Sequence, residues 1–234
     1  MNCPPARYLL FFQYFGTKYS GVMETLTDQP MLGVQNYLER AAQKLRPVTP
    51  IKFYISSRTD AGVHALCNSA HVNIQRAAGK LPFPESIIVS ALNHHLKPEP
   101  IRILSAYRVS ENFHARFSAL SRTYVYRLVT GCSHHSQIPV FERDLCWAPR
   151  GDGLRFWELE FKSRSFLYKQ VRRMAGALVA VGQGKLAPSH IKELLECRDP
   201  LAYPLNTIAP AAGLFLKSVE YDEAAVEEEG NAAE

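Results

Sequence analysis

Short apolar runs that switch between two periodicities dominate this chain of 234 residues. Alternation every second residue is typical of strands, whereas a period near 3.6 residues is typical of helices. We therefore predict strands near residues 8–14, 51–55, 71–74, 101–109 and 124–129 and helices near residues 34–45, 84–96 and 165–181. Strands interrupted by helices, with hairpin-like strand pairs, predict an α+β fold rather than a purely parallel sheet.

The bulk properties exclude several classes of protein. The longest apolar runs are of strand length, far short of the roughly 20 residues that span a bilayer, so no membrane partner is expected. The N-terminal residues leave no room for a secretory signal. Five scattered cysteines without metal spacing indicate reduced, intracellular thiols, and the choice between cytoplasm and mitochondrion stays open.

Charge is distributed unevenly along the chain. The whole chain carries +5, but seven acids and no basic residue follow Lys217, which leaves residues 1–219 at +12. A basic body of this kind is common in proteins that bind phosphate backbones, because each neutralised phosphate releases counterions. A merely soluble basic protein would show the same charge. The last residues, 223–234, are rich in Ala and Glu and are predicted to be a disordered acidic tail.

Two segments carry groups suited to chemistry. In the polar loop after residue 55, Arg58 precedes Asp60 by two positions and Gly62 follows it by two. An arginine held close would keep the carboxylate ionised, as a nucleophile requires, although Asp-x-Gly turns are also common without any catalytic role. The predicted helix of residues 165–181 has one apolar stripe: Leu167, Val171, Met174, Leu178 and Val181. Three basic side chains share another face, which is more commonly a solvated helix surface than a site of phosphate contact: Lys169, Arg172 and Arg173.

Four ordered blocks give the chain a family resemblance. Residues 57–65 read SRTDAGVHA and 113–119 read FHARFSA, followed by Arg122, Tyr124 and Tyr126. Residues 166–176 read FLYKQVRRMAG and 209–216 read APAAGLFL. These blocks are similar to the motifs of the TruA family of tRNA pseudouridine synthases, which isomerise uridine in RNA. The resemblance implies two related halves around a largely antiparallel sheet, with helices packed on one side and a basic RNA-binding cleft.

The resemblance also implies roles for individual residues. Asp60 would be the nucleophile, Arg58 its charge partner, Tyr124 the aromatic group against the target base, and Arg172 would complete the site. Substrate contacts would come from Thr59, His64, Arg116, Arg122, Lys169 and Arg173. The reaction requires no cofactor and no metal, the partner would be RNA, most readily tRNA, and a homodimer is expected. Attack at the sugar or at the base is left open.

The chain departs from the family pattern in two places. Only eight residues, 148–155, join Trp147 to Phe156, where family members carry a larger segment with a His-Asp-Phe block. Val22 and Met23 replace a Trp-Gln pair. Loss of the segment is expected to uncover apolar surface and a sheet edge. Three readings follow: an active synthase, a catalytically impaired RNA-binding isoform, and a remnant without a stable RNA site.

The predicted division of the chain follows the motif blocks. An N-terminal half of residues 1–110 would contain the aspartate loop, and a C-terminal half of residues 111–222 would be shortened between residues 147 and 156. His64 lies near Ser57 and Asp60, but members of a hydrolase triad converge from separate elements, so a triad is rejected.

Overall fold

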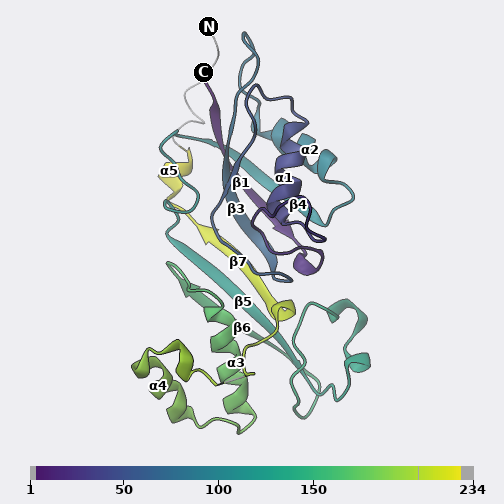
Figure 1. Cartoon of the computed structure of the whole chain (residues 1–234), viewed down its shortest axis with the longest axis vertical. Coiled ribbons are helices and arrows are strands. Elements are labelled where there is room, and N and C mark those ends of the chain that lie inside the picture. Colours follow the sequence, from purple (N-terminus) through teal and green to yellow (C-terminus); the bar gives the residue numbers. More distant parts are fainter. Residues whose placement is uncertain (1–3, 205, 228–234) are drawn as a thin grey trace. The chain divides into compact units, whose positions relative to one another are not determined.

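The structure is a computed structural model that describes residues 4–204 and 206–227, and it confirms the α+β class (Figure 1). Seven strands form a sheet in the order β4-β1-β3-β7-β5-β6, and β2 pairs with β3 outside that path. The strands are β1 Ala6–Tyr14, β2 Phe53–Ile55, β3 His64–Ile74, β4 Ile101–Val109, β5 Ser121–Thr130, β6 Arg155–Ser163 and β7 Leu214–Glu220. β1 pairs antiparallel with both β3 and β4, and β2 pairs antiparallel with β3.

Five α-helices accompany the strands in the described residues. They are α1 Val34–Gln43, α2 Glu85–Leu96, α3 Gln170–Gly182, α4 Pro188–Cys197 and α5 Glu223–Glu227. Short 3₁₀ turns occur at Gly16–Lys18, His135–Gln137, Val140–Glu142, Pro200–Ala202 and Ala211–Gly213. Within these ranges no helix combines the length and the apolarity that a bilayer crossing needs.

The chain divides into two compact units. The first contains Met1–Thr123, Lys162–Arg164 and Leu216–Glu234, and the second contains Tyr124–Phe161 and Ser165–Phe215. The sequence predicted a division near residue 110 instead. The difference arises because the C-terminal strand returns to the first unit, a long-range pairing that no local pattern encodes.

The core of the first unit lies between its strands and two helices. Tyr8, Leu10 and Phe12 of β1 are fully buried. Because side chains alternate across a strand, these three share one face. Helices α1 and α2 pack against each other and reach the sheet through β2 and β4 (Figure 1). The predicted helical cover on one side of the sheet therefore applies to α1 and α2.

The opposite face of β1 is covered differently. Leu9 packs with Val109, Phe113 and Ala115, and the partly buried Val226 of α5 joins this cluster. Apolar burial thus accounts for a short helix where the sequence predicted a disordered tail. The rest of the predicted tail, residues 228–234, lies outside the described residues.

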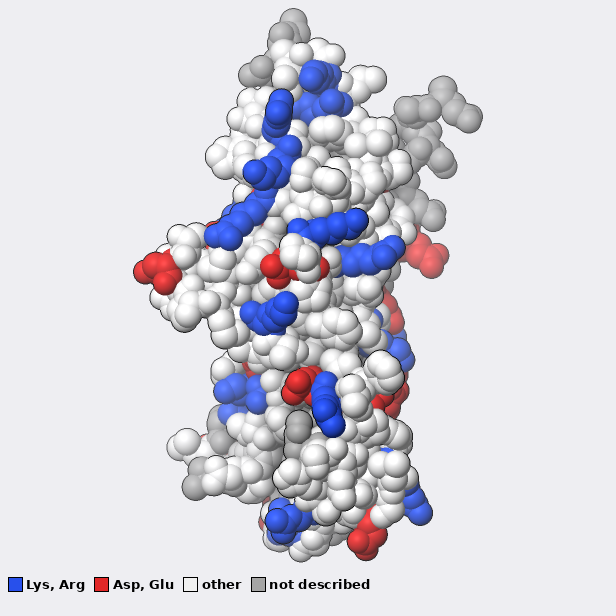
Figure 2. All heavy atoms as spheres, turned by 90° about the vertical axis from the view of Figure 1, so that its right-hand side faces the viewer, with Lys and Arg blue, Asp and Glu red and all other residues white. Residues whose placement is uncertain are grey.

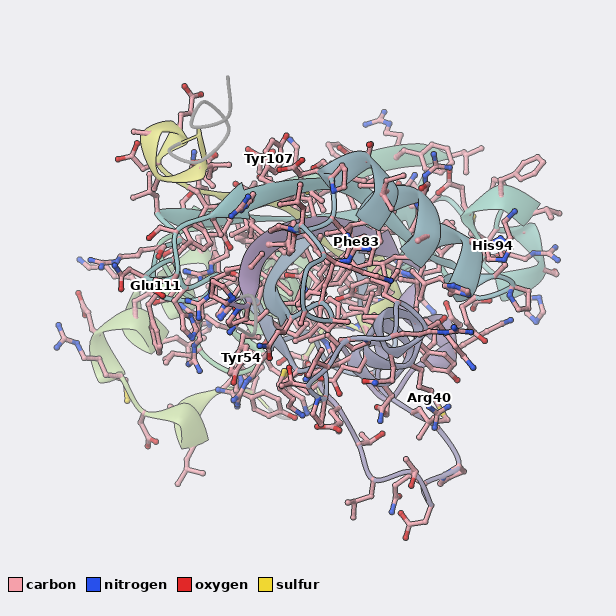
Figure 3. The ribbon with its side chains drawn as sticks, turned by 90° about the horizontal axis from the view of Figure 1, so that it is seen from above. Arg40, Tyr54, Phe83, His94, Tyr107 and Glu111 are labelled. Atoms are coloured by element: carbon pink, nitrogen blue, oxygen red, sulfur yellow. The ribbon has the colours of Figure 1, made fainter. Side chains whose placement is uncertain are left out.

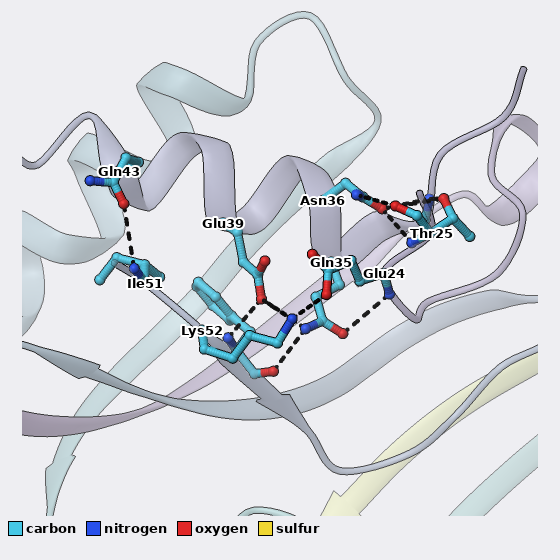
Figure 4. A network of polar contacts seen from close by, with 10 residues as sticks. Glu24, Thr25, Gln35, Asn36, Glu39, Gln43, Ile51 and Lys52 are labelled. Atoms are coloured by element: carbon cyan, nitrogen blue, oxygen red, sulfur yellow. Dashed lines mark hydrogen bonds and ion pairs between the residues drawn. The ribbon is translucent and has the colours of Figure 1, made fainter. Parts of the chain in front are cut away.

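Polar side chains of α1 fix the position of β2 (Figure 4). The Gln35 Nε2 atom donates to the Phe53 carbonyl at 3.0 Å, and the Phe53 amide donates to Glu39 Oε1 at 3.0 Å. Lys52 forms ion pairs with Glu39 and with Glu24. Since these bonds hold both backbone groups of Phe53, β2 is pinned just before the chain enters the Asp60 loop.

In the second unit, the predicted apolar stripe of α3 is buried only in part, at Val171. The predicted stripe begins at Leu167, which is exposed and precedes the helix, and Leu178 is also exposed. The other buried residues of α3 are small: Ala175, Gly176, Ala177 and Ala180. A Cβ on Gly176 would lie 1.8 Å from the Thr207 carbonyl oxygen, so only glycine permits this close packing.

Candidate active site

The predicted catalytic loop, residues 56–63, connects β2 to β3 and is called the Asp60 loop here. Thr59 and Val63 are buried, Asp60 is half-buried and Arg58 is exposed. The Val63 amide donates to the Asp60 carbonyl at 3.1 Å, and Gly62 has a φ of +76°. The backbone therefore turns sharply at Asp60, as the glycine spacing predicted.

A neighbouring segment supports the backbone of the Asp60 loop. Gly21 forms a β-bridge with Asp60, and the Val22 amide donates to the Thr59 carbonyl at 3.2 Å. Gly21 has a φ of +123°, and a Cβ there would lie 2.7 Å from the Thr59 carbonyl oxygen. Val22, which belongs to the second departure from the family pattern, is fully buried. Val22 therefore supports the backbone of the Asp60 loop.

Replacement of Gly21 by alanine is expected to destabilise the first unit. The variant combines a backbone conformation that L-residues avoid with a clash against the loop, together about 2–5 kcal/mol. Gly79→Ala is the matched control, because its φ of +77° is also positive but nothing lies within 4 Å of the added Cβ. Denaturant unfolding of both variants measures the difference, and equal losses would show that the Gly21 contact has no energetic weight.

Beneath the loop lies a buried polar network that sequence reasoning missed. The hydroxyls of Tyr14 and Thr59 are 2.8 Å apart, and Asn68 Nδ2 donates to the Ser57 carbonyl at 3.0 Å. The same amide nitrogen lies 3.4 Å from the Tyr14 hydroxyl. Because buried polar groups without partners are costly, this network favours one loop conformation. Thr59 was predicted to contact substrate, but its hydroxyl points into this network.

His64 also acts in support of the loop. Only 1% of its surface is exposed, and its Nδ1 accepts a hydrogen bond from the Gly16 amide at 3.0 Å. The ring of Phe15 packs edge-on against it with 5.9 Å between centroids. The substrate contact of His64 stays a prediction, and very little of its surface is open to RNA in this structure.

Arg122 connects three backbone segments of the first unit. Its exposure is 8%, and it donates to Ser56 Oγ at 3.2 Å, to the Arg116 carbonyl at 2.7 Å and to the Arg164 carbonyl at 2.7 Å. Its Nε also lies 3.4 Å from Ser57 Oγ. These bonds give Arg122 a positioning role around the Asp60 loop, and its substrate contact stays a prediction.

The remaining predicted residues of the first unit are exposed. Arg58 makes no recorded hydrogen bond or ion pair within the described part of the chain, so its pairing with Asp60 stays a prediction. The Arg116 guanidinium lies 5.7 Å from the Phe117 ring centroid. Both cations are therefore positioned to meet a ligand.

The second unit contains the other predicted residues. Tyr124 is mostly buried and packs edge-on against Phe166, with centroids 5.3 Å apart. Arg172 donates from Nε to the Ala209 carbonyl at 2.8 Å, and the Ala209 amide donates to the Arg172 carbonyl at 3.1 Å. Two of the four sequence blocks quoted above, those that contain residues 172 and 209, thus contact each other directly.

Two further cations of α3 lie over aromatic rings. Lys169 Nζ is 4.8 Å from the exposed ring of Tyr168, and the Arg173 guanidinium is 5.8 Å from the ring of Tyr203. The Tyr203 hydroxyl donates to the Arg173 carbonyl at 2.7 Å. Lys169 is half-buried and immediately precedes α3.

Comparison with known proteins identifies the family. A family model for tRNA pseudouridine synthase matches residues 10–118 and 130–222. The tRNA pseudouridine synthase-like 1 of Xenopus laevis is 54% identical and aligns with 95% of this chain and 93% of its own length. Its Homo sapiens counterpart is 45% identical, over 92% and 90%. A tRNA pseudouridine synthase A of Paramagnetospirillum magneticum is 34% identical, over 92% and 95%.

The family match therefore places the chain in a class of RNA-modifying isomerases. The chain belongs to the TruA family of tRNA pseudouridine synthases, as the four sequence blocks predicted. The relatives also differ from it in length. The alignment with the Xenopus laevis protein runs over 280 residues, more than the 234 of the whole chain, so that relative has internal residues with no counterpart here.

Proposed function

We propose that this chain converts uridine to pseudouridine in tRNA with the carboxylate of Asp60 as nucleophile. The reaction breaks the bond between N1 of uracil and C1′ of the sugar and forms one between C5 and C1′. The proton on C5 leaves and N1 gains a proton, so no oxidant or reductant is needed. The observation that carries the proposal is the half-buried Asp60 on a loop that a β-bridge to Gly21, a backbone hydrogen bond from Val22 and a buried polar network support.

The other predicted site residues keep the roles that the family resemblance implies. A stacked uracil must leave its helix to reach an enzyme group, and an aromatic ring is suited to hold the extruded base. Tyr124 is proposed for that contact and Arg172 for completing the charge balance of the site. Arg58, exposed two residues before Asp60, is proposed to pair with the carboxylate or with the substrate.

The proposal is tested by incubating the purified chain with a tRNA transcript. After digestion to nucleosides, chromatography separates pseudouridine from uridine. Formation of pseudouridine that depends on the Asp60 side chain would support the proposal. No product at high enzyme concentration, together with tight RNA binding, would favour the second candidate function instead.

That second candidate is an RNA-binding isoform with impaired catalysis. It is favoured by one observation, the extra internal residues of the relatives, because a missing segment removes support from the second unit. Measurement of RNA affinity and turnover on the same preparation separates the two candidates. A homodimer is also proposed from the family resemblance, and sedimentation of the purified chain would test it.

Phosphate contacts should dominate the affinity for RNA. On the face shown in Figure 2, Lys and Arg side chains spread over the first unit with few Asp or Glu between them. We expect log Kd to rise linearly with log salt, with a slope of about 0.7 to 0.9 per phosphate contacted.

Lys169→Ala is expected to lower that slope by about one such contact, because its ammonium group is available to a phosphate. Lys185→Ala is the control, since Lys185 is an exposed lysine to which no role is assigned. Fluorescence anisotropy at several salt concentrations measures both slopes. Affinity that is independent of salt would contradict a basic RNA-binding surface.

A further inference from the structure

Four aromatic rings form a continuous cluster on the first unit, outside the Asp60 loop. The rings of Tyr54 and His71 are stacked, with centroids 4.7 Å apart and planes 7° from parallel. His114 lies 4.6 Å from His71, and Phe117 lies 4.4 Å from His114. We call Tyr54, His71, His114 and Phe117 the aromatic platform.

The outer rings of the platform are open to solvent. Phe117 is 73% exposed and Tyr54 is 46% exposed, whereas His71 beneath them is buried. Figure 3 shows Tyr54 and Glu111 on one side of the first unit and Arg40 and His94 on the opposite side. Exposed aromatic rings contribute little to the free energy of folding, because their apolar area stays in water. A ligand that covers the rings would remove this area from water, and the free energy gained would contribute to binding.

The platform rests on rigid backbone. His71 Nδ1 accepts a hydrogen bond from the Ala115 amide at 3.1 Å, and the Tyr221 hydroxyl donates to the Ala115 carbonyl at 2.6 Å. Arg7 Nη1 donates to the Phe113 carbonyl at 2.7 Å. Since each bond ends on the backbone of the segment that carries His114 and Phe117, the rings are positioned before any ligand arrives, which reduces the entropy lost on binding.

Arginines act on the two imidazoles of the platform. Burial, with smaller contributions from Arg7 and His114, lowers the pKa of His71 to about 4. Burial also lowers the pKa of His114, and Arg7 and Arg116 lower it further. Both imidazoles are therefore neutral near pH 7, and no carboxylate is among the groups that shift them. Neutral rings beside arginines suit a ligand with flat rings and negative charge.

The platform also lies beside the strand that leads to Asp60. A single nitrogen, Arg122 Nη2, donates both to Ser56 Oγ at 3.2 Å and to the Arg116 carbonyl at 2.7 Å. The backbone next to Phe117 is thus held against the segment that follows Tyr54. Asp60 is four residues beyond Ser56, at most about 14 Å of extended chain.

We propose that the aromatic platform stacks an unpaired nucleobase of the RNA substrate near the target uridine, with Arg116 at the adjoining phosphate. This inference rests on the proposed function, since it requires an RNA ligand. Stacking on aromatic rings tolerates any base, because every base has a π face. The platform would therefore select for single-stranded character next to the target rather than for sequence.

The test measures binding of an RNA hairpin with an unpaired loop, in the Asp60→Asn background so that no turnover occurs. Phe117→Ala is expected to raise Kd by about 5- to 150-fold. Its salt dependence should not change, because no phosphate contact is lost. Phe117→Trp should bind within about two-fold of the parent, since it keeps an aromatic ring. Phe141→Ala, at another strongly exposed phenylalanine, is the control.

A stacking signature comes from 2-aminopurine placed at successive loop positions. One position should be quenched on binding to the parent and to Phe117→Trp, but not to Phe117→Ala. If the parent binds the hairpin and Phe117→Ala binds equally well, the platform is not an RNA site, while the proposed function stands; a peptide ligand would give this result. If the parent binds no RNA, the platform and the proposed function are both overturned.

Discussion

Asp60→Asn is expected to lower turnover by at least about three orders of magnitude while leaving RNA affinity within about two-fold of the parent. Asparagine has nearly the shape of aspartate, but its amide is a poor nucleophile. The backbone bonds that place residue 60, from Val63 to its carbonyl and through the bridge to Gly21, do not involve the side chain that changes. The loss should therefore be chemical rather than structural.

The size of this effect is measured by single-turnover pseudouridine formation on a tRNA transcript, with anisotropy reporting Kd on the same samples. Asp152→Asn is the control, because it makes the same chemical change at an exposed aspartate in the second unit. If Asp60→Asn keeps turnover within a few-fold of the parent, another group attacks the substrate. A large loss of affinity would instead assign Asp60 to binding.

The sequence predicted the local features of the site well and the distant ones poorly. The alternation of Phe53 and Ile55 predicted β2, and Gly62 predicted the turn after Asp60, because both signals are carried by adjacent residues. The partners of Thr59 are Tyr14 and, through it, Asn68, which lie in two other strands. Only the pairing of β1 with β3 brings them together, so no sequence spacing could identify them.

The arginines show why residue type alone does not determine a role. Arg116 and Arg122 belong to the same sequence block, and both were predicted to bind substrate. Arg116 is exposed beside Phe117, whereas the guanidinium of Arg122 donates hydrogen bonds to Ser56 and to two backbone carbonyls. Burial distinguishes them, and burial depends on how loop 113–117 folds onto β2, which is a tertiary property.

The helix of the second unit shows a different limit. Its apolar stripe predicted a core face through Val171, Met174 and Leu178. Val171 is buried, but the small residues Ala175 and Ala180 are buried in place of Met174 and Leu178. The close approach of Thr207 to Gly176 explains the choice of face. Apart from Val171, the larger apolar residues of the same helix remain exposed or half-buried.

The apolar surface of the second unit leads to the other large expected effect. β6 is the terminal strand in the sheet order, and Phe156 and Trp157 on it are 53% and 47% exposed. Leu195 of α4 and Leu201 are also strongly exposed. The sequence predicted such an open edge from the short connection of residues 148–155. An open strand edge with exposed aromatic residues is a site for aggregation and for dye binding.

Inserting the corresponding segment of the Xenopus laevis relative between Trp147 and Phe156 is expected to stabilise the chain and to raise its turnover. Covering Phe156, Trp157 and Leu195 would gain about 1.5 to 3 kcal/mol for each side chain fully buried. A domain has only about 5 to 15 kcal/mol of net stability. At about 2 to 4 °C for each kcal/mol, the melting temperature should rise by roughly 10 °C or more.

A Gly/Ser insert of equal length is the control for this comparison, because it lengthens the connection without offering apolar partners. Only the relative's segment should raise the melting temperature, abolish binding of a hydrophobic dye and increase pseudouridine formation. Trp157→Glu in the short chain should reduce dye binding without restoring turnover, since it removes apolar surface but supplies no support. If the short chain melts cooperatively at the same temperature as the restored chain and modifies tRNA at the same rate, the segment is dispensable, and the candidate function of an impaired isoform is excluded.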